Sequence, residues 1–175
     1  MSVELNDEAE VKLRLWREIE KVRYGMLGLI GDRSGGHFQP MTAFCEPPSG
    51  EIWFFTRDDT DLARDSAGGA QAMLIIQAKD QAFQACLAGA IEPIREPSRI
   101  EQYWSPMVSA WYPDGKDDPR LTLLRFRARD AQIWLSDSNP IRLLWETAKA
   151  NITKEEPDIG LSASVDLASA LRSAH

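Results

Sequence analysis

Residues 24–56 read YGMLGLIGDRSGGHFQPMTAFCEPPSGEIWFFT, and the fold class can be inferred from their pattern. Three short apolar runs, 24–30, 37–45 and 52–56, alternate here with clusters of Gly, Pro, Ser and Asp. Apolar runs of this length separated by turn residues are typical of β-hairpins. The segment therefore predicts three consecutive antiparallel strands.

More strands are predicted towards the C-terminus. Residues 72–77 and 83–94 are apolar runs of strand length, and residues 124–129 alternate apolar side chains with arginines, as in a strand with one buried face. Residues 131–135 can pair with that strand after a tight turn. The βαβ alternation of parallel sheets is missing, so we predict a small, mainly antiparallel β-barrel with peripheral helices.

Helices are predicted at both ends of the sheet and between its strands. The first has an apolar stripe at helical spacing, formed by Val11, Leu15, Ile19 and Val22. Residues 58–67 can form one or two helical turns. Ser105 and Pro106 are favoured at the start of a helix, and the apolar face of this short helix would carry Met107, Ala110 and Trp111. A last helix is predicted over 140–150.

Length and composition favour one domain. The chain has 175 residues, of which 43% are hydrophobic and 27% charged, values typical of a soluble globular protein with a single core. We assign residues 1–153 to one domain that begins with a helix. Residues 154–175 are mostly small and polar, and we predict a loosely held C-terminal tail there.

The charge balance and the scarcity of metal-binding side chains exclude several functions. A net charge of −7 disfavours nucleic acid and anionic membranes as partners. The acidic N-terminus lacks the pattern of a secretory signal, so we expect a cytoplasmic protein. The histidines are His37 and His175, too few for a zinc site or a ready serine triad. Cys45 and Cys86 are expected to be buried free thiols.

The segment WFFTRDDT, residues 53–60, is a candidate phosphate-binding turn. A strand that runs into a helix start presents unpaired backbone N–H groups, which suit a phosphate. Thr56 and Thr60 add hydroxyls and Arg57 adds a positive charge, whereas the neighbouring aspartates would have to point away or cap the helix. A plain strand followed by a capped helix remains the alternative.

Aromatic residues accompany this turn. Six tryptophans are many for this length, and those near loops or helix ends offer flat surfaces on which a heterocycle can stack: Trp104, Trp111 and Trp134. Each of them taken alone is better explained as a core residue. Aromatic walls beside a phosphate-binding turn are the composition of a flavin pocket, because an isoalloxazine ring needs flat apolar walls and backbone polar groups.

Three segments resemble one known family. HFQPMTAF (37–44), EIWFFTRDDTDLA (51–63) and YWSPMVSAWYPDGKDDPRLTLLRF (103–126) are similar to the general stress protein 26 branch of the pyridoxamine 5′-phosphate oxidase-like split-barrel flavoproteins. The third segment is specific, because it combines two tryptophans, three prolines and an acidic turn in a fixed order. The resemblance runs from about Tyr24 to Ala150. It implies a six-stranded antiparallel split β-barrel, a homodimer, and one FMN in each of two clefts at the subunit interface.

The resemblance also implies cofactor contacts. Four consecutive residues would lie along the isoalloxazine ring: Gln39, Pro40, Met41 and Thr42. Phe55 and Thr56 would offer backbone contacts near the ribityl chain, and the phosphate would be held by Arg57 and Thr60. The pocket walls, some of them from the partner subunit, would be Trp104, Trp111 and Trp134.

This chain departs from the family pattern at three places. The family often has Arg where Gln39 stands and Lys where Leu62 stands, so two cationic contacts are missing and FMN affinity can be reduced. Arg57 can compensate. The true oxidases carry an Arg-Leu-His-Asp-Arg substrate motif, whereas residues 142–146 here read RLLWE. Without that imidazole and second guanidinium, oxidation of vitamin B6 phosphates is not expected.

We therefore expect a cytoplasmic, homodimeric FMN-binding protein that exchanges electrons with NAD(P)H or another small molecule. This chemistry needs no acid or base from the protein, so we assign no catalytic residue and no metal ligand. Alternatives are a non-catalytic flavin-binding or sensing module, and a barrel that has lost its cofactor. A haem or deazaflavin binder is less favoured, because His37 is the sole internal imidazole.

Overall fold

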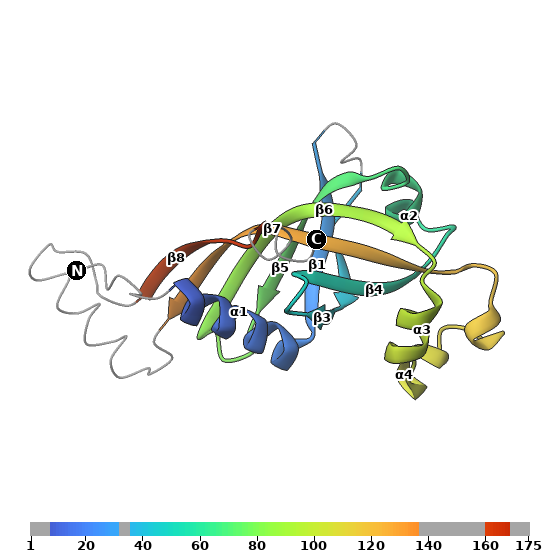
Figure 1. Cartoon of the computed structure of the whole chain (residues 1–175), viewed down its shortest axis with the longest axis horizontal. Helices are drawn as coiled ribbons and strands as arrows, with labels where there is room; N and C mark the ends of the chain where they lie inside the picture. The colour runs from blue at the N-terminus through green and yellow to red at the C-terminus, as the bar shows by residue number, and fades with distance from the viewer. Residues whose placement is uncertain (1–7, 32–35, 137–159, 169–175) are drawn as a thin grey trace, which may run out of the picture.

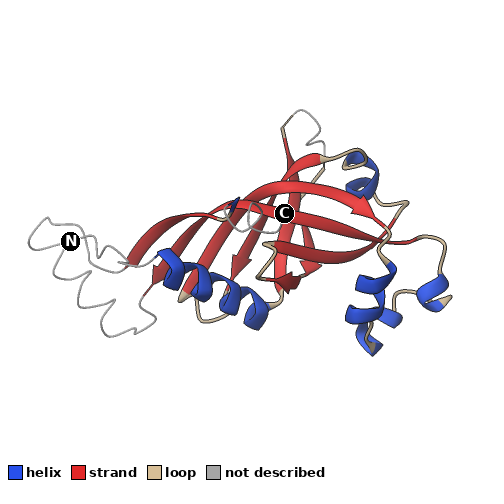
Figure 2. Ribbon diagram, in the orientation of Figure 1, coloured by secondary structure: helices blue, strands red, loops and turns tan. Residues whose placement is uncertain are grey.

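The computed structural model describes residues 8–31, 36–136 and 160–168, which form one strongly curved sheet with helices outside it (Figure 1). In chain order the elements are α1 (Glu8–Val22), β1 (Tyr24–Ile30), β2 (Gln39–Thr42), β3 (Phe44–Glu46), β4 (Glu51–Arg57), α2 (Asp61–Asp65), β5 (Ala70–Gln77), β6 (Phe83–Ile94), α3 (Pro97–Tyr103), α4 (Pro106–Ser109), a 3-10 turn (Gly115–Asp117), β7 (Leu121–Ser136) and β8 (Gly160–Asp166). Figure 2 shows α1 along one flank of the sheet and α3 and α4 together near another end.

The strands form an antiparallel sheet that curls back on itself. Their order is β2-β1-β5-β6-β7-β4-β3, and β8 pairs with β7. β2 and β3 stand at opposite ends of this order, yet Ala43 alone separates them in the chain. The Ala43 amide donates to the Arg23 carbonyl (2.8 Å), and β2 also approaches β4. The predicted mainly antiparallel split barrel with peripheral helices is confirmed.

Two strand boundaries differ from the prediction. The run 37–45 is divided into β2 and β3, because the chain changes its pairing partner at Ala43. Residues 124–129 and 131–135 do not pair with each other across a tight turn; both belong to β7, which pairs with β6 along its length. With β2 and β3 counted as one interrupted strand, β1 to β7 give the six strands of the barrel.

The long β6–β7 pair bends at a register shift between Ala88 and Gly89. A Cβ atom on Gly89 would lie 2.2 Å from the carbonyl oxygen of Arg127, so the two backbones approach too closely for any other residue. Bulges of this kind increase the local twist of a strand pair. Gly89 is therefore where the sheet bends.

The C-terminal region differs more from its prediction. Residues 160–166, predicted to belong to a loose tail, form β8 and extend the sheet beside β7. Val165 and Leu167 are buried against the core, and the alternation of Leu161, Ala163 and Val165 with polar residues is a strand pattern that the prediction overlooked. The helix predicted over 140–150 lies outside the described residues.

Two apolar clusters stabilise the molecule. The main core joins α1 to the strands of the sheet, and the predicted α1 stripe is confirmed by the burial of Val11, Leu15 and Ile19. A second cluster lies under α3 and α4 and contains Trp53, Ile100, Val108, Tyr112, Leu121 and Leu123. α3 was not predicted. It attaches the loop region after β6 to the outside of β4.

The short helix α4 begins as predicted but turns a different face to the protein. Ser105 is its N-cap, with Oγ 3.4 Å from the Val108 amide. Met107 and Trp111, predicted to lie on its packing face, are exposed, whereas Val108 and Tyr112 are buried. The face that carries Tyr112 packs on the second cluster, because the Tyr112 phenol can donate a hydrogen bond to the Thr56 carbonyl there.

Candidate functional site

The candidate site begins at the junction between β4 and α2, residues 56–61. Thr60 is the N-cap of α2: its Oγ1 accepts from the Ala63 amide (3.3 Å) and donates to the Arg57 carbonyl (2.9 Å). Thr56 Oγ1 lies 3.1 Å from Thr60 Oγ1. The predicted strand-to-helix junction is thus present and places two hydroxyl groups and one guanidinium within a single turn.

Arg57 is paired with an aspartate of the same junction. Its Nε donates to Asp59 Oδ1 (3.0 Å) and its Nη2 to Asp59 Oδ2 (2.6 Å), which is a bidentate contact. The hydrogen bond raises the pKa of Arg57 and lowers that of Asp59. The sequence suggested that the aspartates point away or cap the helix. Asp59 does neither, because it forms an ion pair that neutralises Arg57, the one arginine of the junction.

One edge of β4 is uncovered next to this junction. β7 pairs with β4 up to Arg57, but β3 pairs with it only as far as Trp53. In an antiparallel ladder the backbone groups of alternate residues point to the same edge. The N–H and C=O of Phe55 therefore point to the edge that β3 leaves, where no strand in the described part of the chain pairs with them.

Five aromatic side chains pack beside this edge, and we call them the aromatic cluster: Phe44, Phe55, Tyr103, Trp104 and Tyr112. Their ring centroids lie 4.9 to 6.3 Å apart in tilted or edge-to-face pairs. The Tyr112 phenol donates to the Thr56 carbonyl (2.9 Å), and the Tyr103 phenol donates to the Glu46 carboxylate (2.6 Å). The aromatic cluster thereby holds α3 and α4 against the end of β4.

A second arginine lies near the junction. The Asp58 amide donates to the Arg120 carbonyl (2.9 Å), and the charge of Arg120 contributes to the lowered pKa of Asp59. Arg120 Nε is 3.7 Å from the carboxylate of Asp118, a buried residue that also accepts from the Arg120 amide (2.9 Å). Arg57 and Arg120 are thus each paired with an aspartate two positions away.

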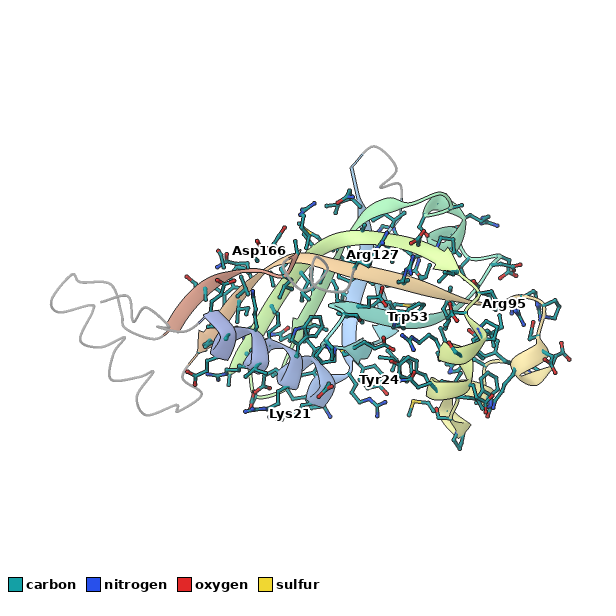
Figure 3. All side chains as sticks on the ribbon, viewed as in Figure 1. Lys21, Tyr24, Trp53, Arg95, Arg127 and Asp166 are labelled. Atoms are coloured by element: carbon teal, nitrogen blue, oxygen red, sulfur yellow. The ribbon has the colours of Figure 1, made fainter. Side chains whose placement is uncertain are left out.

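Arg95, at the end of β6 (Figure 3), holds the loop that carries Arg120. Its guanidinium donates to three main-chain carbonyls, those of Lys116 (3.3 Å), Asp118 (3.0 Å) and Leu121 (2.8 Å). Because Leu121 stands opposite Arg57 in the β4–β7 pair, these hydrogen bonds also fix the loop relative to the junction.

The residues expected along a flavin ring lie on β2, which pairs with β1 and approaches β4. Pro40 is exposed, and the other three are half-buried: Gln39, Met41 and Thr42. The structure therefore brings β2 to the part of the molecule that holds Phe55, although the two segments are joined through the β2–β3 bend and do not pair.

The other predicted contacts are distributed unevenly. Leu62 is buried in the main core and supplies no charge. Trp104 packs on Phe55, with the Lys116 ammonium 5.9 Å from its ring, and Trp111 is 77% exposed. Trp134 lies on β7 thirteen positions beyond Leu121, roughly 40 Å along the strand. It is too far from the junction to reach a ligand there within its own chain.

The titratable groups near the site favour their neutral forms. Burial raises the pKa of Tyr112 to about 12, and burial together with Glu46 raises that of Tyr103. Burial also raises the pKa of Cys45 to about 12 and that of Cys86 by less. Both cysteines are free but half-buried rather than fully buried. None of these four groups ionises near neutral pH.

Some contributors to the site were not identified from the sequence. Arg120 was part of the quoted acidic turn, but its approach to Asp59 depends on the packing of two loops. For α3 a local signal exists, because Pro97 is its first residue and Ile100 and Tyr103 have helical spacing. For the contacts of Arg95 no sequence signal exists.

Within residues 8–31, 36–136 and 160–168, no group of three His, Cys, Asp or Glu side chains is arranged to hold a metal ion. In the same ranges no helix is long and apolar enough to cross a membrane.

Comparisons with known proteins connect this geometry to one family. The model of the pyridoxamine 5′-phosphate oxidase-like family matches residues 10–158. A search of the curated proteins finds no match.

Several solved structures are similar over most of the chain. A protein from Jannaschia sp. CCS1 assigned to general stress protein 26 is 33% identical, with a TM-score of 0.73 over 90% of this chain and 99% of that one. A protein from Xanthomonas campestris pv. campestris assigned to a general stress family is 37% identical, with a TM-score of 0.69 over 76% and 92%. The general stress FMN/FAD binding protein from the phytopathogen Xanthomonas citri is 38% identical, with a TM-score of 0.67 over 73% and 89%.

Proposed function

This chain belongs to the pyridoxamine 5′-phosphate oxidase-like family, and from that premise we propose that it is an FMN-binding flavoprotein of the general stress type that transfers electrons. One similar protein, from Xanthomonas citri, is an FMN/FAD binding protein. The likeness to it supports a flavin as the ligand. We choose FMN because the junction at the end of β4 offers two hydroxyls and one arginine, a set of donors that suits one phosphate group.

One observation carries the proposal: the uncovered edge of β4 runs directly into the Thr56–Thr60 junction. A flavin mononucleotide needs backbone hydrogen-bonding groups, a flat apolar wall and an anion site within the length of one ligand. Phe55 offers the backbone groups, the aromatic cluster offers the wall, and the junction carries the hydroxyls of Thr56 and Thr60, 3.1 Å apart, together with the Arg57 side chain. The residues present therefore fit the cofactor.

In this arrangement the protein binds and orients the ligand. Thr56, Thr60 and Arg57 would hold the phosphate, and Gln39 to Thr42 on β2 would lie along the ring. When bound, FMN supplies the hydride and electron transfer chemistry. The aromatic cluster excludes water from one side of the ring. Since the tyrosines of the cluster stay protonated near neutral pH, the protein contributes no base there.

We also propose that the protein is a homodimer with FMN at the interface. Met26 and Ile75 are neighbours across β1 and β5, and both are more than a third exposed. The Tyr24 hydroxyl lies 3.7 Å from Met107 Sδ, so this apolar face continues onto α4. Exposed apolar faces of this kind are usually buried by a partner. Trp134 can then reach a cleft of the partner subunit rather than its own.

The substrate is proposed to be a small electron donor or acceptor, such as NAD(P)H, rather than a vitamin B6 phosphate. That exclusion depends on residues 142–146, which lie outside the described residues. A cytoplasmic location is also part of the proposal.

The proposal is tested by saturating the purified protein with FMN, desalting it, and recording the absorbance near the flavin maximum. Retained absorbance that bleaches with NADH or NADPH supports an oxidoreductase. Retained absorbance that does not bleach with NADH or NADPH supports a binding or sensing module instead. A colourless protein after saturation overturns the proposal and favours a barrel that has lost its cofactor. Size-exclusion chromatography tests the dimer against the chain mass of 19.7 kDa.

A further inference from the structure

The further inference concerns Asp59 and rests on the proposed function. A guanidinium group binds phosphate through two parallel N–H donors. In Arg57 both of those donors, Nε and Nη2, are directed at the two carboxylate oxygens of Asp59, at 3.0 and 2.6 Å. The Asp59 carboxylate thus already occupies the two donors that a phosphate would use.

A second positive charge acts on the same carboxylate. Arg120 is held beside the junction by the hydrogen bond from the Asp58 amide to its carbonyl (2.9 Å), and its charge favours the ionised form of Asp59. Its guanidinium also forms an ion pair with Asp118 at 3.7 Å. Asp59 therefore marks a position where the charges of two arginines both stabilise an anion.

We propose that Asp59 is a displaceable internal substitute for the ligand phosphate, which occupies Arg57 in the flavin-free protein and leaves it when FMN binds. Arg57 then binds the phosphate, and the charge of Arg120, whose main chain is held by the Asp58 amide, favours an anion at the same position.

The exposure of the pair makes this exchange inexpensive. The Arg57 and Asp59 side chains are 40% and 49% exposed, and exposed ion pairs contribute little to stability because water solvates both partners once they separate. Asp59 belongs to a turn and not to β4 or α2, so its side chain can rotate away without disturbing the strand or the helix. The hydroxyls of Thr56 and Thr60 remain in place.

The proposal predicts that Asp59 sets how strongly the site distinguishes a phosphorylated flavin from an unphosphorylated one. Riboflavin has the same ring and ribityl chain as FMN but no phosphate, so its binding does not require Asp59 to leave Arg57. The ratio of the FMN affinity to the riboflavin affinity therefore isolates the effect of Asp59 from any change in ring binding.

The experiment is a fluorescence titration of FMN and of riboflavin into the full chain, as wild type, Asp59→Asn, Asp59→Ala and the matched control Asp61→Asn. Asp61 is an exposed carboxylate of the same segment that pairs with Arg64 instead of Arg57. At about 0.15 M salt, long-range charge effects are largely screened. We expect both Asp59 variants to raise the FMN-to-riboflavin affinity ratio by about 5-fold, the upper range for an exposed ion pair, and Asp61→Asn to leave it unchanged.

Arg120→Ala is expected to lower the same ratio, whereas Arg129→Ala, a control arginine on the exposed face of β7, should not. An unchanged or lower ratio in both Asp59 variants would overturn the inference while leaving FMN binding intact. Equal increases in the Asp59 and Asp61 variants would also overturn it, since they would indicate a general charge effect. If wild type and variants bind neither flavin, the proposed function fails, and this inference fails with it.

Discussion

The Tyr112 phenol donates a 2.9 Å hydrogen bond to the main-chain carbonyl of Thr56, a residue 56 positions earlier in the chain. This contact joins the loop after α4 to the C-terminal end of β4. It therefore determines how the uncovered edge of β4 and the Thr56–Thr60 junction are held, and it makes the stability of the candidate site depend on a residue distant in sequence.

Tyr112→Phe is expected to destabilise the protein by about 1 kcal/mol, because a buried carbonyl loses one hydrogen-bond partner. Chemical unfolding measures this change. FMN affinity should fall as well, since Thr56 is less firmly placed. Tyr24→Phe is the matched control, because the Tyr24 side chain is 55% exposed. Equal unfolding midpoints for the two variants would contradict a structural role of the Tyr112 hydroxyl.

Stability is expected to decrease at alkaline pH. Burial raises the pKa of Tyr112 to about 12 from an ordinary value of 10.0, and that of Cys45 to about 12 from 9.0. The unfolded chain therefore releases these protons at lower pH than the folded chain does. The associated stability is complete below pH 9 and is lost as the pH rises towards 12. Urea midpoints at pH 8 and pH 11 measure the loss, which should be smaller in Cys45→Ala and Tyr112→Phe.

Thr60→Ala is expected to cost about 1 kcal/mol of stability, because α2 loses its N-cap. The same change removes one hydroxyl from the proposed phosphate contacts, so FMN affinity should fall while riboflavin affinity stays near the wild-type value. Thr60→Ser keeps the hydroxyl and should restore both properties. A serine variant as weak as the alanine variant would assign the effect to the lost methyl group.

Arg57→Ala is expected to lower FMN affinity by roughly 10-fold to 100-fold, the range for loss of a charge-assisted hydrogen bond. Isothermal titration calorimetry provides the measurement. Arg64→Ala removes a neighbouring exposed arginine that also pairs with an aspartate, and it should leave the affinity unchanged. If Arg57→Ala binds FMN as tightly as wild type, the phosphate is held elsewhere.

Gly89→Ala is expected to destabilise the fold by about 1–3 kcal/mol, because the added Cβ would meet the Arg127 carbonyl at 2.2 Å. Gly36→Ala is the control, since its Cβ would have no neighbour within 4 Å. Thermal unfolding of the two variants should therefore differ by several degrees. Similar melting temperatures would show that the β6–β7 pair relaxes around the methyl group without loss.

Most of the fold could be predicted because its signals are local. The apolar runs of β1, β4, β5 and β6 are bounded by turn residues, and the stripe on α1 has helical spacing. The failures have identifiable causes. β7 was divided in two because the polar Arg129 and Asp130 interrupt the apolar alternation, although both lie inside a continuous strand. β8 was missed although Leu161, Ala163 and Val165 alternate with polar residues, because its small, polar composition outweighed that alternation in the prediction.

The candidate site could be predicted only in part. Arg57 and Thr60 are adjacent to a recognisable strand end, and the N-cap role of Thr60 follows from its residue type. The pairing of Arg57 with Asp59 could not be predicted, because three aspartates follow that arginine closely and each is a possible partner. The separation of Trp134 from Trp104 likewise depends on the length of β7, and the sequence pattern predicted two short strands in place of this single long one.

Residue types and their spacing thus specified the strands, the α1 helix and the Thr-Arg-Thr junction, since each depends on hydrogen bonds and apolar contacts among near neighbours. The chain had to fold before an edge of β4 was left uncovered and the Arg120 carbonyl met the Asp58 amide. Both features follow from where β3 stops pairing and from how Arg95 and Tyr112 hold distant segments together, and contacts between distant segments leave no periodic trace in the amino-acid order.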